Sequence, residues 1–169
     1  MNEQLQTLQE TAKNMKVNQL KDAPSRATQM ADEIKALKRD NQNLKTQLTN
    51  QKSAEVFDNV EEINGYKVIS NIVPADMSAL RQLADKWKND NSSDILVLGA
   101  SGDNKASLVV AVNKAAQDKG VKAGDLIKKI SKEIQGGGGG RPDMAQAGGK
   151  NPAGLTNALQ LAKDIIKSL

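Results

Sequence analysis

The sequence has no cysteine and no histidine, and its three aromatic residues make up only 2% of 169 positions. The lack of cysteine excludes disulfides, as is usual for proteins of the reducing cytosol. The lack of histidine removes the usual general base and the commonest metal ligand, and with it any Ser–His or Cys–His nucleophile. The composition therefore predicts an aliphatic core and excludes a Ser–His or Cys–His enzyme. A carboxylate-only magnesium site stays open, although no D-x-D or E-x-x-E cluster lies near the glycines of the C-terminal part.

Long apolar runs are also missing. No stretch approaches the roughly 18 apolar residues of a membrane span, and the opening MNEQLQTLQETAK has no apolar region typical of a secretory signal. We therefore expect no membrane contact and a cytoplasmic location.

The charge is distributed unevenly. Residues 1–55 carry nine basic and seven acidic side chains, residues 56–120 carry seven and nine, and residues 121–169 carry eight and four. The net charge of +4 thus comes mainly from the last 49 residues. A basic bias of this size is compatible with a polyanionic partner, although many other proteins share it.

The first 55 residues predict a helical arm. Leu5, Leu8, Ala12 and Met15 have the spacing of a short amphipathic helix, and nothing interrupts a second helix between Pro24 and about Ser53. A narrow seam follows this second helix, and it needs a partner: the first helix, another domain or a second copy. The seam consists of Met30, Ile34, Leu37, Asn41, Leu44 and Leu48. Asn41 either fixes the register of a buried seam or lies at its edge in water.

Residues 56–169 predict a small globular domain of sheet and helices, which makes the chain α+β. The expected strands are rich in β-branched and apolar residues, and the expected helices have apolar residues on one face. We expect strands at 60–64, 66–73, 94–100 and 105–113, the last two as a hairpin, and helices at 75–89, 122–134 and 152–169. Trp87 follows Leu80 and Leu83 at helical spacing, which favours a core position over base stacking.

Five consecutive glycines, Gly136 to Gly140, precede Arg141-Pro142. Three interpretations are open: a flexible linker, a structural loop in which backbone passes close to backbone, or a nest of N–H groups that binds phosphate. The run is short, lacks serine and lies between amphipathic helices, all of which disfavour a linker. A P-loop is excluded because no Lys-Ser/Thr follows, and a dinucleotide fingerprint because no strand precedes it.

The string GGGGGRPDMAQAGG (136–149) resembles the DHH-associated domain at the C-terminus of alanyl-tRNA synthetases. The order of the surroundings is similar too: a helical arm, VLGASGDNKASLVVAVNKAAQDKGVKAGDLIKKI (97–130), the glycine motif and a final helix. DHH phosphoesterases typically have histidine after the glycines, where this chain has Arg141. The resemblance therefore favours the synthetase branch over a nuclease-like DHH fragment.

The resemblance implies a noncatalytic C-terminal fragment of an alanine–tRNA ligase. Its parent would use ATP, magnesium and zinc in catalytic and editing domains that this chain lacks, so no cofactor is expected here. The implied partners are tRNA(Ala), those two domains and a second copy bound through the arm. The implied role is to bind tRNA and help couple aminoacylation to editing.

The motif positions Gly136, Gly137, Gly138, Gly139, Gly140, Arg141, Gln146, Gly148 and Gly149 become candidate tRNA contacts. Four nearby lysines join them: Lys128, Lys129, Lys132 and Lys150. The lysines also fit a solvated helix face, Asp143 fits a pair with Arg141, and Gln146 fits either base recognition or support of the loop. The alternative function is a dimerisation or interdomain scaffold that does not touch RNA.

Overall fold

The computed structural model describes residues 2–90 and 92–169, with the side chains of residues 49 and 52 left out of the description. The chain divides into two compact units, residues 1–45 and 46–169. Among the described residues, no helix is both long enough and apolar enough to cross a bilayer.

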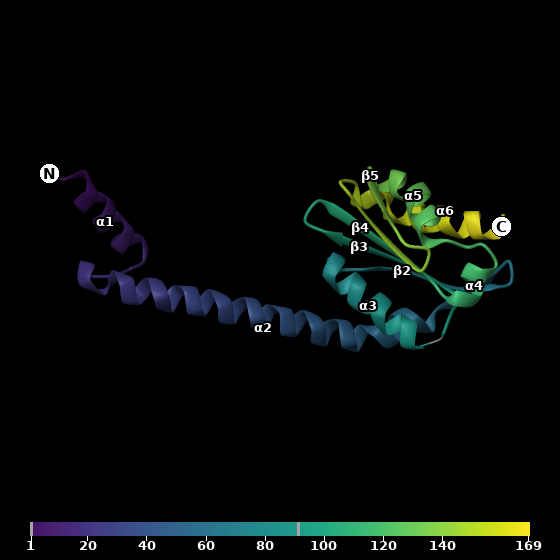
Figure 1. The fold of residues 1–169 in the computed structure, drawn as a ribbon, viewed down its shortest axis with the longest axis horizontal. Coiled ribbons are helices and arrows are strands. Elements are labelled where there is room, and N and C mark those ends of the chain that lie inside the picture. Colours follow the sequence, from purple (N-terminus) through teal and green to yellow (C-terminus); the bar gives the residue numbers. More distant parts are fainter. Residues whose placement is uncertain (1, 91) are drawn as a thin grey trace. The chain divides into compact units, whose positions relative to one another are not determined.

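The first unit contains α1 (Glu3–Asn14), the short 3-10 helix η1 (Leu20–Asp22) and the start of α2 (Ala23–Asp58) (Figure 1). Asn2 caps α1, because its side-chain oxygen accepts a hydrogen bond from the backbone N–H of Gln4. α1 ends at a bend in which the N–H of Val17 bonds the carbonyl of Ala12, and Lys16 has a φ of 56°. The two predicted helices of the arm are therefore confirmed.

α2 has 36 residues and continues past the expected boundary between residues 55 and 56. Its last turn carries Val56 and Phe57, which are buried against the sheet of the second unit. The assignment of separate roles to residues 1–55 and 56–169 stays a prediction.

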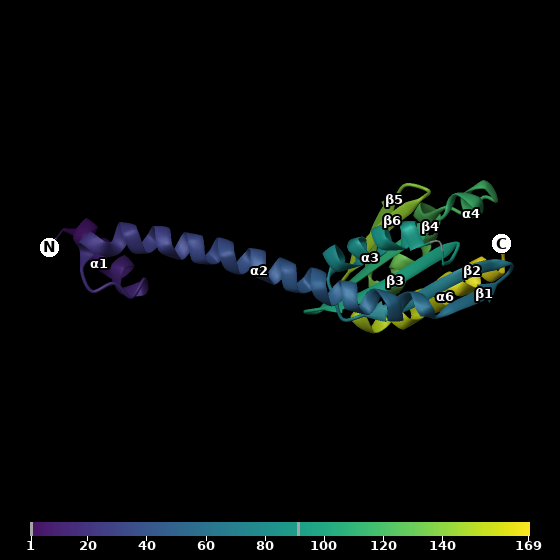
Figure 2. The same ribbon diagram turned by 90° about the horizontal axis from the view of Figure 1, so that it is seen from below.

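The second unit is built on a six-stranded mixed sheet with strand order β1-β2-β3-β4-β6-β5 (Figure 2). The strands are β1 (Val60–Ile63), β2 (Tyr66–Val73), β3 (Ile95–Gly102), β4 (Lys105–Val112), β5 (Gly136–Gly140) and β6 (Met144–Gly149). Only β2 and β3 are parallel, and α3 (Met77–Asp90) connects them; the other pairs are antiparallel. The predicted α+β class is confirmed.

The predicted hairpin is β3–β4, with Gly102 paired to Lys105 across Asp103-Asn104. Asn104 has a φ of 54°, a left-handed conformation that asparagine tolerates better than most residues. Asn64-Gly65 turns the chain between β1 and β2 in the same way, with positive φ at both residues. Both turns follow from asparagine and glycine chemistry that the sequence displays.

Helices cover both faces of the sheet. One core lies under α3 and the end of α2, and includes Trp87, which is 3% exposed as its helical spacing predicts. The other lies under α5 (Ala123–Ile130) and α6 (Leu155–Lys167). The remaining elements are α4 (Lys114–Asp118), η2 (Ser131–Ile134) and η3 (Pro152–Gly154). Aliphatic side chains fill both cores.

Candidate nucleic-acid interface

The five glycines form β5, a strand at the edge of the sheet, so the linker interpretation is wrong. The run is a strand rather than a loop, but the close approach of backbone to backbone that the structural interpretation expects is present, and phosphate binding stays a prediction. β5 pairs antiparallel with β6, and Gly139 lies opposite Gln146. At Gly136, Gly138 and Gly140 a Cβ would collide with the carbonyl oxygens of Gly148, Gln146 and Met144 respectively. At Gly137 and Gly139 a Cβ would meet nothing within 4 Å. Packing therefore requires glycine at alternate positions, while the other two leave the backbone open to an approaching molecule.

The glycine strand also packs against the helix that covers its other face. A Cβ on Gly124, in the first turn of α5, would lie 2.9 Å from the carbonyl oxygen of Gly140. The N–H of Ala123 donates to the carbonyl of Pro142 at 2.9 Å. α5 thereby holds the β5–β6 turn in place from one side.

A cavity of about 280 Å³ opens on the α3 side of β5 and β6. Side chains alternate between the faces of a strand, so Met144 and Gln146 face α3 while Ala145 and Ala147 face α5. The cavity is lined by Val109, Gly139, Gly140, Arg141, Met144, Ala145 and Gln146. Four of these are predicted site residues, and their floor is glycine backbone.

Asp143 links Arg141, which lines this cavity, to a second cation, Lys88. Its carboxylate lies 3.2 Å from the Nε of Arg141 and 3.3 Å from the Nζ of Lys88 on α3. Partial desolvation raises the pKa of Asp143, but the hydrogen bond from Lys88 and the charges of Arg141 and Lys88 outweigh it, so the pKa is below its ordinary value. The expected pair between Asp143 and Arg141 is present.

Arg81, also on α3, reaches the centre of the β5–β6 pair. Its Nε donates to the side-chain oxygen of Gln146 at 2.6 Å. Arg81 and Lys88 are seven positions apart on α3, a rise of about 10.5 Å, and Asp143 and Gln146 are three positions apart, about 10 Å of extended chain. The two lengths match, so α3, which packs on β3 and β4, extends the side chains of Arg81 and Lys88 across to Gln146 and Asp143.

The remaining predicted lysines lie elsewhere. Lys128 and Lys129 are on α5 and Lys132 is on η2, which packs with α5 on the opposite face from Gln146. Lys150 follows the end of β6 where Gly148 and Gly149 pair with Gly137 and Gly136, far along the strand from Arg141. The structure therefore divides the predicted residues between the two faces of the sheet.

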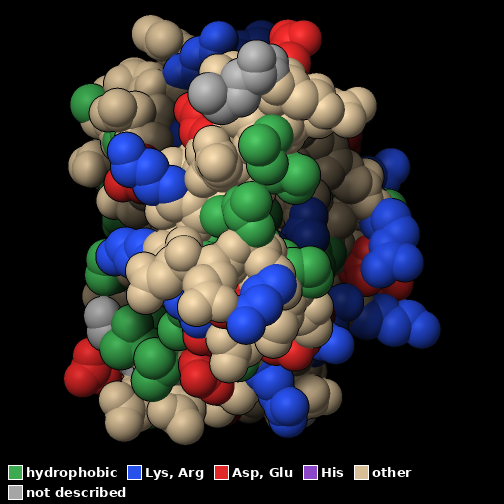
Figure 3. Space-filling view, turned by 90° about the vertical axis from the view of Figure 1, so that its left-hand side faces the viewer, with side chains coloured by type: hydrophobic (Ala, Val, Ile, Leu, Met, Phe, Trp, Pro, Cys, Tyr) green, Lys and Arg blue, Asp and Glu red, His purple; other side chains and the backbone are tan. Residues whose placement is uncertain are grey.

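Figure 3 shows the molecule from one side. Basic, acidic and apolar side chains are interspersed on the surface seen in this view.

The seam of α2 is open in the single chain. Ile34, Leu37, Leu44 and Leu48 are 51%, 67%, 64% and 49% exposed. Asn41 is exposed as well, and Met30 is half-buried. Apart from Met30, these seam residues are thus mostly exposed, and the partner that their spacing predicts stays a prediction.

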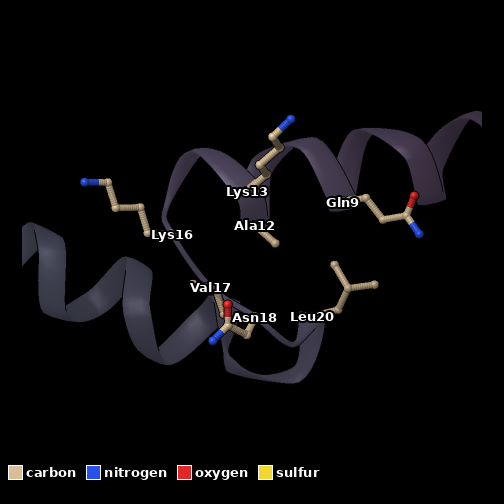
Figure 4. Close-up of a pocket in the computed structure, with 7 residues that line it drawn as sticks. All are labelled: Gln9, Ala12, Lys13, Lys16, Val17, Asn18 and Leu20. Carbon is tan, nitrogen blue, oxygen red and sulfur yellow. The ribbon is translucent and has the colours of Figure 1, made fainter.

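A second hollow lies between α1 and the bend that follows it (Figure 4). Ala12 and Leu20 point into it, while the ammonium groups of Lys13 and Lys16 point away. No set of polar groups converges there, so it offers no chemistry. In the part of the chain that the structure describes, no three His, Cys, Asp or Glu side chains gather as metal ligands.

Arg81 and Lys88 are the residues that the sequence interpretation missed. They lie 55 and 48 positions before Gly136, and only the sheet topology brings them near the glycine strand. Their spacing of seven, which places both on one helix face, was the available signal.

Comparison with known proteins agrees with this architecture. The DHHA1 domain model matches residues 64–168. Alanine–tRNA ligases of Lacticaseibacillus paracasei and Latilactobacillus sakei are 52% and 44% identical over 167 residues, 98% of this chain and 19% of each relative. The chain thus spans about a fifth of the length of these relatives.

A solved structure gives the same result for the fold. The C-Ala domain of Aquifex aeolicus alanyl-tRNA synthetase is 31% identical with a TM-score of 0.60, covering 64% of this chain and 98% of that one. The chain therefore belongs to the DHHA1 family, in the form of the C-terminal domain of alanyl-tRNA synthetases.

Proposed function

We propose that this chain binds tRNA(Ala) as the accessory C-terminal domain of an alanine–tRNA ligase, and that the α3 side of β5 and β6 is the contact surface. The observation that carries the proposal is the cavity floored by Gly139 and Gly140 and bordered by Arg141 and Gln146. Bare glycine backbone allows a ribose or phosphate to come close, and flanking guanidinium groups match phosphate geometry.

The wider charge distribution supports this surface without making it strongly basic. Residues 121–169 have a net charge of +4, but the lysines of α5 and η2 face the other side of the sheet. RNA bound over β5 and β6 would therefore meet few cations. If three to five phosphates are neutralised, affinity should fall roughly tenfold or more between 50 and 200 mM salt.

A filter-binding titration with a tRNA(Ala) transcript at these two salt concentrations tests the proposal. We expect weak binding that is lost as salt rises. Absence of binding at 50 mM salt, or binding that salt leaves unchanged, would contradict it. An unrelated tRNA transcript serves as the matched control for specificity.

The scaffold function is the second candidate, because four large apolar side chains of α2 lie open to solvent. We propose that this seam binds a second copy or the catalytic and editing domains of the parent chain. The two functions are compatible, since the seam and the cavity use different residues.

The whole ligase would supply what this chain does not. We propose a cytoplasmic parent that uses ATP, magnesium and zinc in its other domains and that this domain helps couple aminoacylation to editing. The chain does not fit the zinc itself, because it has no cysteine or histidine. Its own contribution is to bind and orient RNA.

A further inference from the structure

Two arginines border the β5–β6 surface, and the structure places them in different states. Arg141 is 77% exposed, and its Nε and Nη2 face the two carboxylate oxygens of Asp143 at 3.2 and 3.4 Å. Arg81 instead meets the neutral amide oxygen of Gln146. Among the described residues Arg81 forms no ion pair. In this part of the chain Arg81 thus has no carboxylate within 4 Å, whereas Arg141 shares the single carboxylate of Asp143 with Lys88.

The contact with Gln146 also orients Arg81. A guanidinium has one N–H on Nε and the rest on its two terminal nitrogens. Because Nε is the donor to Gln146, the terminal N–H groups stay available in a plane fixed by that bond. A fixed guanidinium loses less entropy on binding an anion than a mobile one, and its paired N–H groups suit two phosphate oxygens.

Arg81 is placed beside the open backbone as well. Gln146, its partner, lies opposite Gly139 in the strand pair, and a Cβ on Gly139 would meet nothing within 4 Å. A phosphodiester strand crossing Gly139 would thus pass next to Arg81. The same strand near Arg141 would meet the carboxylate of Asp143, which repels phosphate and competes for the guanidinium.

We propose that Arg81, rather than Arg141, is the principal phosphate ligand of this surface, with Gln146 as the residue that positions it. The proposal rests on the proposed function, because it names a ligand for the same RNA contact. The chemical class recognised is a phosphodiester backbone. Arg141 contributes less, because it must first leave Asp143.

The test measures the affinity of the chain for a tRNA(Ala) transcript at several salt concentrations. Arg81→Ala should weaken binding about tenfold and lower the slope of log Kd against log salt by about one. Arg81→Lys should restore that slope, because the charge returns, but only part of the affinity, because the planar fork does not. Arg141→Ala should weaken binding less than Arg81→Ala.

Two further variants separate charge from structure. Gln146→Glu places a carboxylate against Arg81 and should weaken binding at least as much as Arg81→Ala. Arg39→Ala removes an exposed arginine of α2 outside this surface and is the matched control, with affinity expected to stay unchanged. All variants should melt within about 2 °C of the wild type, because the three arginines are exposed and Gln146 is half-buried, and surface substitutions usually change stability by about 0.5 kcal/mol or less.

The outcomes of the two proposals are distinguishable. If the wild-type chain binds no tRNA, the proposed function is overturned together with this inference. If the wild type binds but Arg141→Ala costs more affinity than Arg81→Ala, or Arg81→Ala leaves the salt slope unchanged, only this inference is overturned.

Discussion

Alanine at two neighbouring glycines of β5 should have opposite effects on stability. A Cβ on Gly138 would lie 2.5 and 2.6 Å from the Cα and Cβ of Ala147, and closer still to the carbonyl oxygen of Gln146. Carbon atoms in contact prefer about 3.5–4.0 Å, so the strands would have to separate by roughly 1 Å. A methyl group on Gly137 meets nothing within 4 Å.

The expected magnitude follows from these contacts. Overpacking costs about 1–3 kcal/mol, and separation of the strands weakens one or two hydrogen bonds of about 1 kcal/mol each. We therefore expect Gly138→Ala to lower the free energy of unfolding by about 3 kcal/mol and Tm by roughly 6–12 °C. Gly137→Ala should leave stability unchanged or raise it by up to about 1 kcal/mol, because alanine restricts the unfolded chain.

Circular dichroism during thermal and urea unfolding measures both variants against the wild type. Hydrogen exchange of the β6 amides then shows whether β5 has detached in Gly138→Ala while the rest of the unit stays folded. Equal stability of the two variants, or a larger loss for Gly137→Ala, would refute the alternating requirement for glycine.

Three other predictions concern different parts of the chain. Because the pKa of Asp143 is lowered, the stability contributed by its carboxylate is present above the unfolded pKa and is lost as pH falls through the folded one. Asp143→Asn should therefore lose less Tm than the wild type between pH 5 and 2.5, and equal losses would contradict this. The double variant Leu37→Asp, Leu44→Asp should abolish self-association in sedimentation experiments without unfolding residues 56–169. The control variant Ala36→Asp, Asn43→Asp, shifted by one position, should still self-associate. A single monomeric species for the wild type and both variants would rule out a homodimer. The chain should catalyse no ATP–pyrophosphate exchange, and a rate above background would disprove its noncatalytic role.

Side-chain periodicity explains which elements could be predicted from the sequence. The sequence predicts a strand at 66–73, and β2 occupies those residues. The β3–β4 hairpin follows from two β-branched runs around Asp103-Asn104. The helices were predictable because their apolar residues recur on one face. In each case the pattern of apolar and polar side chains predicts the secondary structure of the backbone.

The strand pair β5–β6 could not be predicted in this way. Five glycines show no alternation of apolar and polar side chains, and glycine is depleted in strands because it costs entropy and packs poorly. What makes the run a strand is the backbone of β6 alongside it, a tertiary effect that no local pattern displays. The pairing of Gln146 with Arg81 depends on the same topology, so the candidate site was predicted only on its glycine side.

The alternation within β5 makes natural sequence variation informative about binding. Packing alone requires glycine at positions 136, 138 and 140, so retention of glycine there among relatives gives no information about RNA binding. Gly137 and Gly139 are different, since a side chain would project into open space. If relatives retain glycine at these two positions as strictly as at the other three, selection must act through a molecule that approaches the strand. If relatives admit alanine or serine there, the backbone of β5 is not touched closely. The residues that relatives have at positions 137 and 139 thus indicate whether β5 is a contact surface or only the edge strand of the sheet.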